Sequence, residues 1–278
     1  MPPKKPSPKK LFASLKTHPK KTLGQNFLLD ENIARKITDA ARITAEDEIL
    51  EIGPGLGALT RLLCEKARRV IAVEKDPNLI PPLTKALSRL DNVEIVAADA
   101  LKADFSHYIK GKRLKVVANL PYSISSQILL KLIEHRKLFS LLVLMLQREV
   151  GARIASPPGG KTYGSISVFI QAFADVERVM SVPPEAFWPT PEVESIVLRL
   201  TPLAEPRTPI PDEDLFRRIV RGSFSSRRKI IANSLGSLFS KERVEEMLES
   251  AGIERTRRAE TLSVEEFGRL CRTAYETP

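Results

Sequence analysis

Short apolar segments alternate with segments of helical periodicity over roughly the first half of the chain. Strands are predicted at 49–52, 69–73, 93–97, 114–118 and 141–146, and helices at 30–41, from 56, at 79–90 and at 126–135. Strands that alternate with helices in this way are typical of a parallel sheet with helices on both faces. The pattern therefore predicts an α/β fold of the Rossmann-like kind, in which ligands bind beyond the carboxyl ends of the strands.

The pattern changes in the last third of the chain. One more apolar strand is expected from about Glu192, a proline-containing linker at 201–211, and only helical periods over 212–276. We therefore expect an α/β domain at 22–203 and a small all-α domain at 204–278. Residues 1–21 contain seven lysines and no acid, and are predicted to form a disordered basic tail. Such a tail either attracts nucleic acid non-specifically or only keeps the protein soluble.

Composition narrows the class of protein. The net charge of +10 comes mainly from the tail, and the remainder of the chain is nearly balanced. No apolar run reaches the length of about 18 residues that a membrane span requires, and no apolar segment follows the first lysines as in a secretory signal. Cys64 and Cys271 lie far apart and match no metal-binding spacing. We expect a cytoplasmic globular protein with two free thiols and no metal.

The stretch EIGPGLGALT at 51–60 joins the end of a predicted strand to the start of a helix. Gly53 and Gly55 lack a Cβ, so the backbone there can approach a ligand closely, and the new helix presents free N–H groups. The turn therefore indicates a nucleotide-type cofactor, although an ordinary strand–helix turn has the same pattern. Gly53, Gly55 and Ala58 also match G-x-G-x-x-A, so the turn alone does not exclude a dinucleotide.

Polar side chains recur where the later strands end. Glu74 follows Gly53 by 21 residues, a spacing at which a carboxylate can accept hydrogen bonds from ribose hydroxyls. Asp99 follows the third of these strands and could accept a hydrogen bond from an adenine amino group. The alternatives are a solvated surface acid for Glu74 and a helix cap for Asp99.

The tetrapeptide Asn119-Leu120-Pro121-Tyr122 directly follows the fourth strand. The amino group on a nucleobase is a weak nucleophile, because its lone pair delocalises into the ring. An Asn side-chain carbonyl and a nearby backbone carbonyl can accept its two N–H bonds and aim the lone pair at an electrophile. Pro121 restricts the backbone, and Tyr122 offers a ring on which a flipped base can stack. The alternative is a plain polar turn without a catalytic role. The polar residues at the ends of the other strands argue against this alternative.

At this point the chain resembles the ribosomal RNA adenine N6-dimethyltransferases of the small subunit, the bacterial KsgA/RsmA group and its eukaryotic relatives. The resemblance runs from about Gly24 to the C-terminus. It rests on GQNFLLD (24–30), EIGPGLGALT (51–60), VIAVEKD (70–76), NLPYSIS (119–125), LQREV (146–150), YGSISV (163–168), VPPEAFWPTPEVESIVLRL (182–200), FSSRRKIIANSL (224–235) and RAETLS (258–263). It implies a class I methyltransferase sheet and S-adenosylmethionine as cofactor.

The resemblance also implies roles for individual residues. The cofactor would contact Asn26 and Leu28 in a closing N-terminal segment, Gly53 at its amino acid end, Glu74 at the ribose, Asp99 at the adenine and Asn119 at the methionine part. Asn119, Leu120, Pro121 and Tyr122 would form the catalytic turn, and Phe187 would help Tyr122 to sandwich the target adenine. Alternatively, Phe187 anchors its loop on the core. Ser123 stands where many members have a second Asn, so no catalytic role is assigned to it.

By this resemblance the substrate is two adjacent adenines of small-subunit ribosomal RNA, each dimethylated at N6 during ribosome biogenesis. The partner would be an assembling ribosomal subunit, and the protein would be a monomer. Basic residues of the helical domain could bind this RNA, namely Arg221, Arg227, Arg228 and Lys229. A solvated, salt-bridged helix face is the alternative for them.

Three rival functions remain open at the level of the sequence. The first is the antibiotic-resistance methyltransferases, which modify an adenine of large-subunit RNA and share the NLPY-type turn. The long segment AFWPTPEVES favours the small-subunit group. The second is a non-catalytic assembly or RNA-binding factor, against which the intact polar strand ends argue. The third, an NAD-dependent oxidoreductase, rests on the glycine turn alone.

Overall fold

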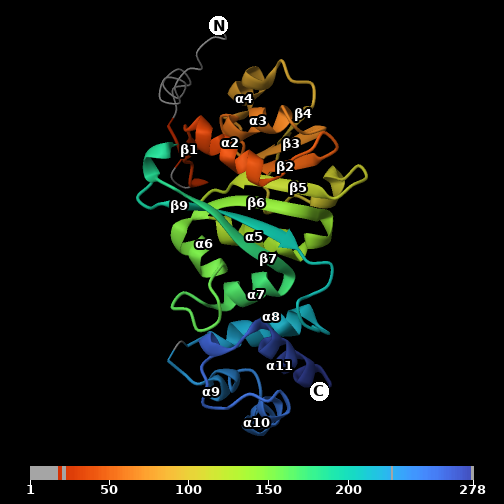
Figure 1. Ribbon diagram of the computed structural model, residues 1–278, viewed down its shortest axis with the longest axis vertical. Helices are drawn as coiled ribbons and strands as arrows, with labels where there is room; N and C mark the ends of the chain where they lie inside the picture. Colours follow the sequence, from red (N-terminus) through yellow and green to blue (C-terminus); the bar gives the residue numbers. More distant parts are fainter. Residues whose placement is uncertain (1–17, 21–22, 227, 277–278) are drawn as a thin grey trace. The chain divides into compact units, whose positions relative to one another are not determined.

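The computed structural model describes residues 18–20, 23–226 and 228–276 of the chain (Figure 1). The chain forms two compact units. The first contains the residues up to Gly151 together with Glu177–Pro202, and the second contains Ala152–Val176 and the residues from Leu203 onward.

A seven-stranded sheet forms the centre of the first unit. Its strands are β2 (Glu48–Ile52), β3 (Arg69–Glu74), β4 (Val93–Ala97), β5 (Leu114–Asn119), β6 (Phe139–Gln147), β7 (Ala174–Val182) and β9 (Ser195–Pro202). Their order is β4-β3-β2-β5-β6-β9-β7, and Figure 1 shows β3, β2, β5 and β6 side by side. The pairs among β2 to β6 are parallel, whereas β9 runs antiparallel to β6. The predicted α/β fold is confirmed, with an antiparallel strand added.

The strand order places a switch point between β2 and β5. From β2 the chain moves outward through α3 (Ala58–Cys64) and α4 (Ile80–Leu87) to β4, and it then returns to β5 and crosses through α5 (Ser125–Glu134) to β6. Right-handed crossovers in opposite directions put their helices on opposite faces of a sheet. The carboxyl ends of β2 and β5 therefore border a crevice, which is where open α/β sheets bind ligands.

Local sequence explains where the first helices begin. Helix α2 (Glu31–Ala40) starts after Asp30, whose carboxylate accepts hydrogen bonds from the backbone N–H groups of Asn32 and Ile33 at 2.8 and 3.1 Å. This confirms Asp30 as the predicted cap. Helix α4 carries its two prolines in the first turn, where no helical N–H is lost.

Two short strands escaped prediction because each has only two residues. Strand β1 (Phe27–Leu28) pairs antiparallel with β8 (Phe187–Trp188), which joins the N-terminal segment to the loop before β9. Neither has enough residues to show a period. Strand β7 was also missed, because many of its residues are exposed and no apolar run marks it.

The second unit contains helices and no strand of its own among its described residues beyond the start of β7. It includes α7 (Ser165–Phe173), α8 (Glu213–Ser223), α9 (Ile231–Leu235), α10 (Lys241–Ser250) and α11 (Val264–Glu276), with α6 (Arg148–Ile154) leading into it. Short 3-10 turns occupy Phe105–Tyr108, Arg136–Leu138, Pro184–Ala186 and Ala259–Thr261. None of the helices within the described ranges is long and apolar enough to cross a membrane.

The boundary between the units differs from the expected one. Residues 152–176, which we expect in the α/β domain from the sequence, instead pack with the C-terminal helices. The reason is the apolar helix α7, whose Phe173 ring meets Phe216 of α8 edge-on at 6.1 Å. The basic tail predicted at 1–21 lies mostly outside the described residues. Its Lys20, however, is described and is held by an ion pair with Asp76 rather than free.

Candidate active site

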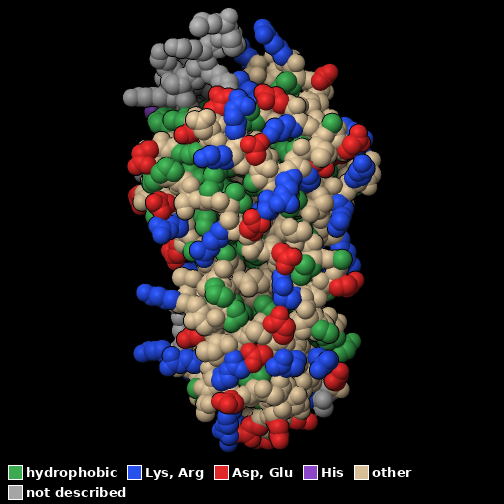
Figure 2. Space-filling view, in the orientation of Figure 1, with side chains coloured by type: hydrophobic (Ala, Val, Ile, Leu, Met, Phe, Trp, Pro, Cys, Tyr) green, Lys and Arg blue, Asp and Glu red, His purple; other side chains and the backbone are tan. Residues whose placement is uncertain are grey.

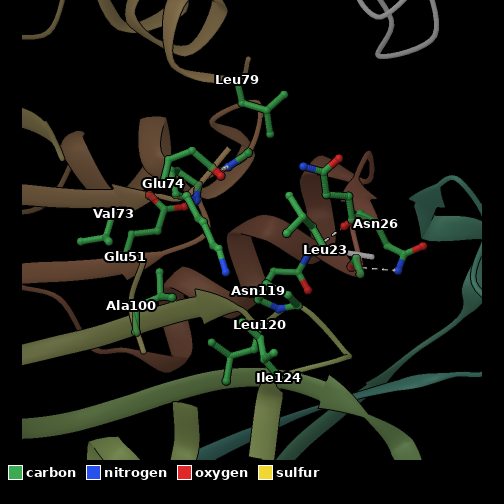
Figure 3. A pocket seen from close by; sticks show the side chains of 18 of the residues that line it. Leu23, Asn26, Glu51, Val73, Glu74, Leu79, Ala100, Asn119, Leu120 and Ile124 are labelled. Atoms are coloured by element: carbon green, nitrogen blue, oxygen red, sulfur yellow. Dashed lines mark hydrogen bonds between the residues drawn. The ribbon is translucent and has the colours of Figure 1, made fainter. Parts of the chain in front are cut away.

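A pocket opens at the carboxyl ends of β2, β3 and β5 (Figure 3). Its empty space, counted together with the open solvent at its mouth, is about 1090 Å³. Nine of the residues singled out in the sequence line it together: Asn26, Leu28, Gly53, Glu74, Asp99, Asn119, Leu120, Pro121 and Tyr122. Their joint location is observed, whereas the individual roles assigned to them remain predictions.

The glycine turn lines the pocket directly after strand β2. Gly53 and Gly55 have φ angles of +70° and +55°, which favour glycine, and the Gly53 N–H donates to the carbonyl of Val73 at 2.9 Å. A Cβ on Gly55 would lie 3.1 Å from the ring of Phe27. The turn is thus pressed against the N-terminal segment.

Glu74 is buried and fixes this turn. Its Oε2 accepts the Gly55 N–H at 3.1 Å, and its Oε1 accepts the Asp76 N–H at 2.8 Å. Burial raises the pKa of Glu74, although these backbone hydrogen bonds oppose the rise. Each carboxylate oxygen keeps a further lone pair, so the side chain can still accept hydrogen bonds from a ligand.

A second acid, Glu51, lies beside Glu74 in the pocket and was missed by the sequence analysis (Figure 3). Its side chain is 1% exposed, and its Oε2 has no hydrogen-bond partner among the described residues. Burial, with the nearby Glu74, raises its pKa to about 8. An acid within the apolar strand EILEI was the available sign. A ligand that carries positive charge would favour the ionised form of this buried acid.

Asp99 sits on a loop held by two lysines. Its Oδ2 contacts the Lys75 ammonium at 2.9 Å and its Oδ1 accepts the Leu101 N–H at 3.0 Å. The hydrogen bond from Lys75 holds its pKa below the usual value. Lys131 of α5 donates to three carbonyls of the same loop, those of Ala100, Leu101 and Ala103.

The turn after β5 is fixed from two sides. The Asn119 Nδ2 donates to the Asn26 carbonyl at 3.0 Å, which leaves the side-chain Oδ1 of Asn119 available in the pocket (Figure 3). On the other side, the Tyr122 hydroxyl and the buried Ser195 hydroxyl lie 2.5 Å apart. Burial raises the pKa of Tyr122, so its phenol stays neutral.

Phe187 does not line the pocket. It is 2% exposed, pairs with Leu28 across the β1–β8 ribbon and packs in the main core cluster. In this conformation its ring is covered, which favours the alternative in which it anchors the loop. A stacking role would require the ring to move out.

The predicted RNA-binding residues belong to the second unit. Arg221, Arg228 and Lys229 are exposed, and Arg227 lies outside the described residues. Arg217, which is on helix α8 with Arg221, instead places its guanidinium carbon 4.8 Å from the centre of the Phe169 ring. Basic and acidic side chains are interspersed on the face that Figure 2 shows, so charge alone marks no RNA site there.

The strand order and the pocket define the class of protein. A mostly parallel sheet with the antiparallel strand β9 next to its edge strand, and a glycine turn facing an acid on the neighbouring strand, is the class I methyltransferase fold. Two solved structures share it over nearly the whole chain. A dimethyladenosine transferase from Plasmodium falciparum has a TM-score of 0.77 and 27% identity, over 90% of this chain and 98% of that one. The 23S rRNA methyltransferase ErmE has a TM-score of 0.69 and 26% identity, over 89% of this chain and 98% of that one.

The family follows from the sequence itself. Residues 16–275 match the family described as ribosomal RNA adenine dimethylase, and the chain belongs to it. Curated relatives include the ribosomal RNA small subunit methyltransferase A of Moorella thermoacetica, 48% identical over 92% of both chains. That of Geobacter metallireducens is also 48% identical, over 91% of this chain and 94% of its own. The resemblance seen in the sequence is confirmed.

The protein is therefore an S-adenosylmethionine-dependent methyltransferase of ribosomal RNA. The pocket fits this cofactor, because S-adenosylmethionine carries a sulfonium and an ammonium group, and positive charge beside the buried acid Glu51 would favour the ionised form of that acid. The dinucleotide alternative left open by the glycine turn is not favoured by these comparisons.

Proposed function

We propose that this enzyme transfers methyl groups to N6 of two adjacent adenines in small-subunit ribosomal RNA, within an assembling subunit in the cytoplasm, and acts as a monomer. The supporting observation is the Asn119 side chain, whose amide nitrogen donates to the Asn26 carbonyl while its carbonyl oxygen has no hydrogen bond to another described residue and lies in the pocket. The substrate follows from the small-subunit name of relatives that match the chain over nearly its full length.

In the proposed reaction the cofactor supplies an electrophilic methyl group. Gly53 and Gly55 admit it closely, Glu74 accepts from its ribose, Asp99 from its adenine, and Asn26 and Leu28 close over it. Asn119 and the backbone carbonyl of Leu120 or Pro121 accept the N–H bonds of the target amino group, so that its lone pair points at the methyl carbon. Tyr122 holds the flipped base by stacking. The amino nitrogen loses a proton to solvent after each transfer.

In the proposed complex, Asp99 exchanges one hydrogen-bond partner for another. The adenine amino group and Lys75 both approach the same carboxylate, so Lys75 must share or leave Asp99 when the cofactor binds. The RNA contacts would come from Arg221, Arg227, Arg228 and Lys229. Selection of one adenine pair requires the shape of folded RNA, because a four-residue turn reads only a base.

The test is mass spectrometry of ribosomal RNA after incubation of the protein with S-adenosylmethionine and immature small or large subunits. We expect dimethyladenine at two neighbouring positions of the small-subunit RNA only. Asn119→Ala should reduce methyl transfer by about 10³-fold while the fold is retained. Methylation of the large subunit would favour the resistance-type function. Full activity of the Asn119 variant would refute the mechanism.

A further inference from the structure

The N-terminal segment, defined as residues 23–28, is tied to the first unit through one buried carboxylate. Asp76 follows strand β3 and is 3% exposed. Its Oδ1 accepts from the Lys20 ammonium at 2.8 Å, and its Oδ2 accepts from the Gln25 amide at 2.8 Å. Gln25 in turn accepts the backbone N–H of Lys20 at 2.8 Å through Oε1. The side chains of Asp76 and Gln25, with the ammonium and the backbone N–H of Lys20, thus close a ring of hydrogen bonds at the start of the segment.

The same segment reaches the catalytic turn directly. The carbonyl of Asn26, one residue after Gln25, accepts the side-chain amide of Asn119 at 3.0 Å. Gly24 lies so close to the turn that a Cβ there would be 3.0 Å from the Tyr122 nitrogen. The position of the Asn119 amide therefore depends on where residues 24–26 are held.

We infer that Asp76 is a positioning residue for methyl transfer: through Lys20 and Gln25 it holds the N-terminal segment so that the Asn26 carbonyl orients the Asn119 amide toward the target amino group. This inference rests on the proposed function. The role differs from cofactor binding, because Asp76 itself does not line the pocket. An amide that rotates freely presents its carbonyl oxygen and its NH₂ to the substrate in turn, and a small misplacement of such a group costs up to about a hundredfold in rate.

Asp76→Asn is a selective test, because it removes one hydrogen bond of Asp76 and can keep the others. An Asn oxygen can keep the bonds from Lys20 and from the Asn78 N–H, which caps the following turn. The Asn nitrogen then faces the Gln25 Nε2, donor against donor. Gln25 cannot flip to relieve this, since its Oε1 is needed by the Lys20 N–H. The substitution thus breaks the connection to Gln25 and preserves the local turn.

We expect Asp76→Asn and Gln25→Ala each to lower the single-turnover rate about ten- to a hundredfold, with saturating cofactor and immature small subunits. The double variant should be no slower than Asp76→Asn alone, because both break one connection. Asp39→Asn, which removes an exposed carboxylate paired with Lys66 on the same unit, is the matched control and should keep the wild-type rate. A rate that returns to the wild-type value at saturating cofactor, or additive losses in the double variant, would overturn the inference.

A readout that needs no RNA separates this inference from the proposed function. The Asn119 side-chain amide resonance, assigned with Asn119→Ala, should shift and exchange faster with solvent in Asp76→Asn, and should be unchanged in Asp39→Asn. An unmoved resonance refutes the positioning role whatever the substrate is. Absence of methylation by the wild-type protein, with the resonance shifted as expected, would refute only the proposed function.

Discussion

The buried acid Glu51 should make the first unit lose stability as the pH rises. Its pKa is raised by burial from 4.5 to about 8, so between these values the folded protein holds a proton that the unfolded chain has released. The unfolded state then binds fewer protons, and the free energy of unfolding falls with increasing pH across this window. The slope approaches about 1.4 kcal/mol per pH unit. Between pH 5 and pH 8 the loss amounts to about 3 kcal/mol.

Glu51→Gln removes this titration and keeps the side-chain volume. The predicted quantity is the free energy of unfolding of the variant minus that of the wild type. We expect this difference to increase by about 3 kcal/mol from pH 5 to pH 8. Glu74 titrates in both proteins, so its own contribution largely cancels in the difference. Glu65→Gln, which removes an exposed acid on the same unit, controls for the change in net charge.

The assay is urea denaturation of the cofactor-free protein at half-unit steps of pH. Trp188 is the only tryptophan of the chain and lies in the first unit, so its fluorescence reports that unit separately. This matters because a protein of two units need not unfold in one step. Curves for wild type and Glu51→Gln that stay parallel from pH 5 to pH 8 would refute a proton held by Glu51.

Four further substitutions test three other contacts of the site. Gly55→Ala places a Cβ at a φ of +55° and 3.1 Å from the Phe27 ring, so we expect a loss of about 1–2 kcal/mol in thermal or urea unfolding and weaker cofactor binding by calorimetry. Lys131→Met deprives three loop carbonyls of their donor and should lower the free energy of unfolding by about 1–3 kcal/mol. An unchanged free energy of unfolding would mean that water replaces the ammonium fully. Ser195→Ala and Tyr122→Phe should show a coupling of about 1 kcal/mol in a double-mutant cycle of unfolding, and a coupling of zero would mean that the hydroxyl pair contributes nothing.

The sheet could be predicted from the sequence because its central strands are buried on both faces. Strand β2 is buried at all five positions and is apolar in the sequence apart from Glu48 and Glu51, and most of β3 is a continuous apolar run. The polar residues at the ends of such strands must meet at one edge, which is why Glu74 and Asn119 could be placed together without a structure.

The contacts that complete the site could not be predicted in this way. Lys20 and Asp76 are 56 residues apart, and nothing in either neighbourhood marks them as partners. The lysine-rich composition before residue 22 even argued for a disordered tail. The burial of Phe187 depends on the register of two-residue strands, and such strands carry no periodicity.

In the proposed reaction, two hydrogen bonds across the turn at 119–122 would let a short peptide act as a fixed acceptor. Asn119 is held by Asn26 on the N-terminal side, and Tyr122 is held by Ser195 at the start of β9. Both partners come from segments far away in the sequence, and both are in place in the protein alone. Under the proposed mechanism the turn would therefore not need the substrate to organise it, and the Asn119 carbonyl would be oriented before the base arrives. A preorganised acceptor costs little reorganisation during the reaction, which is the condition under which hydrogen bonds to a reacting amino group accelerate it most.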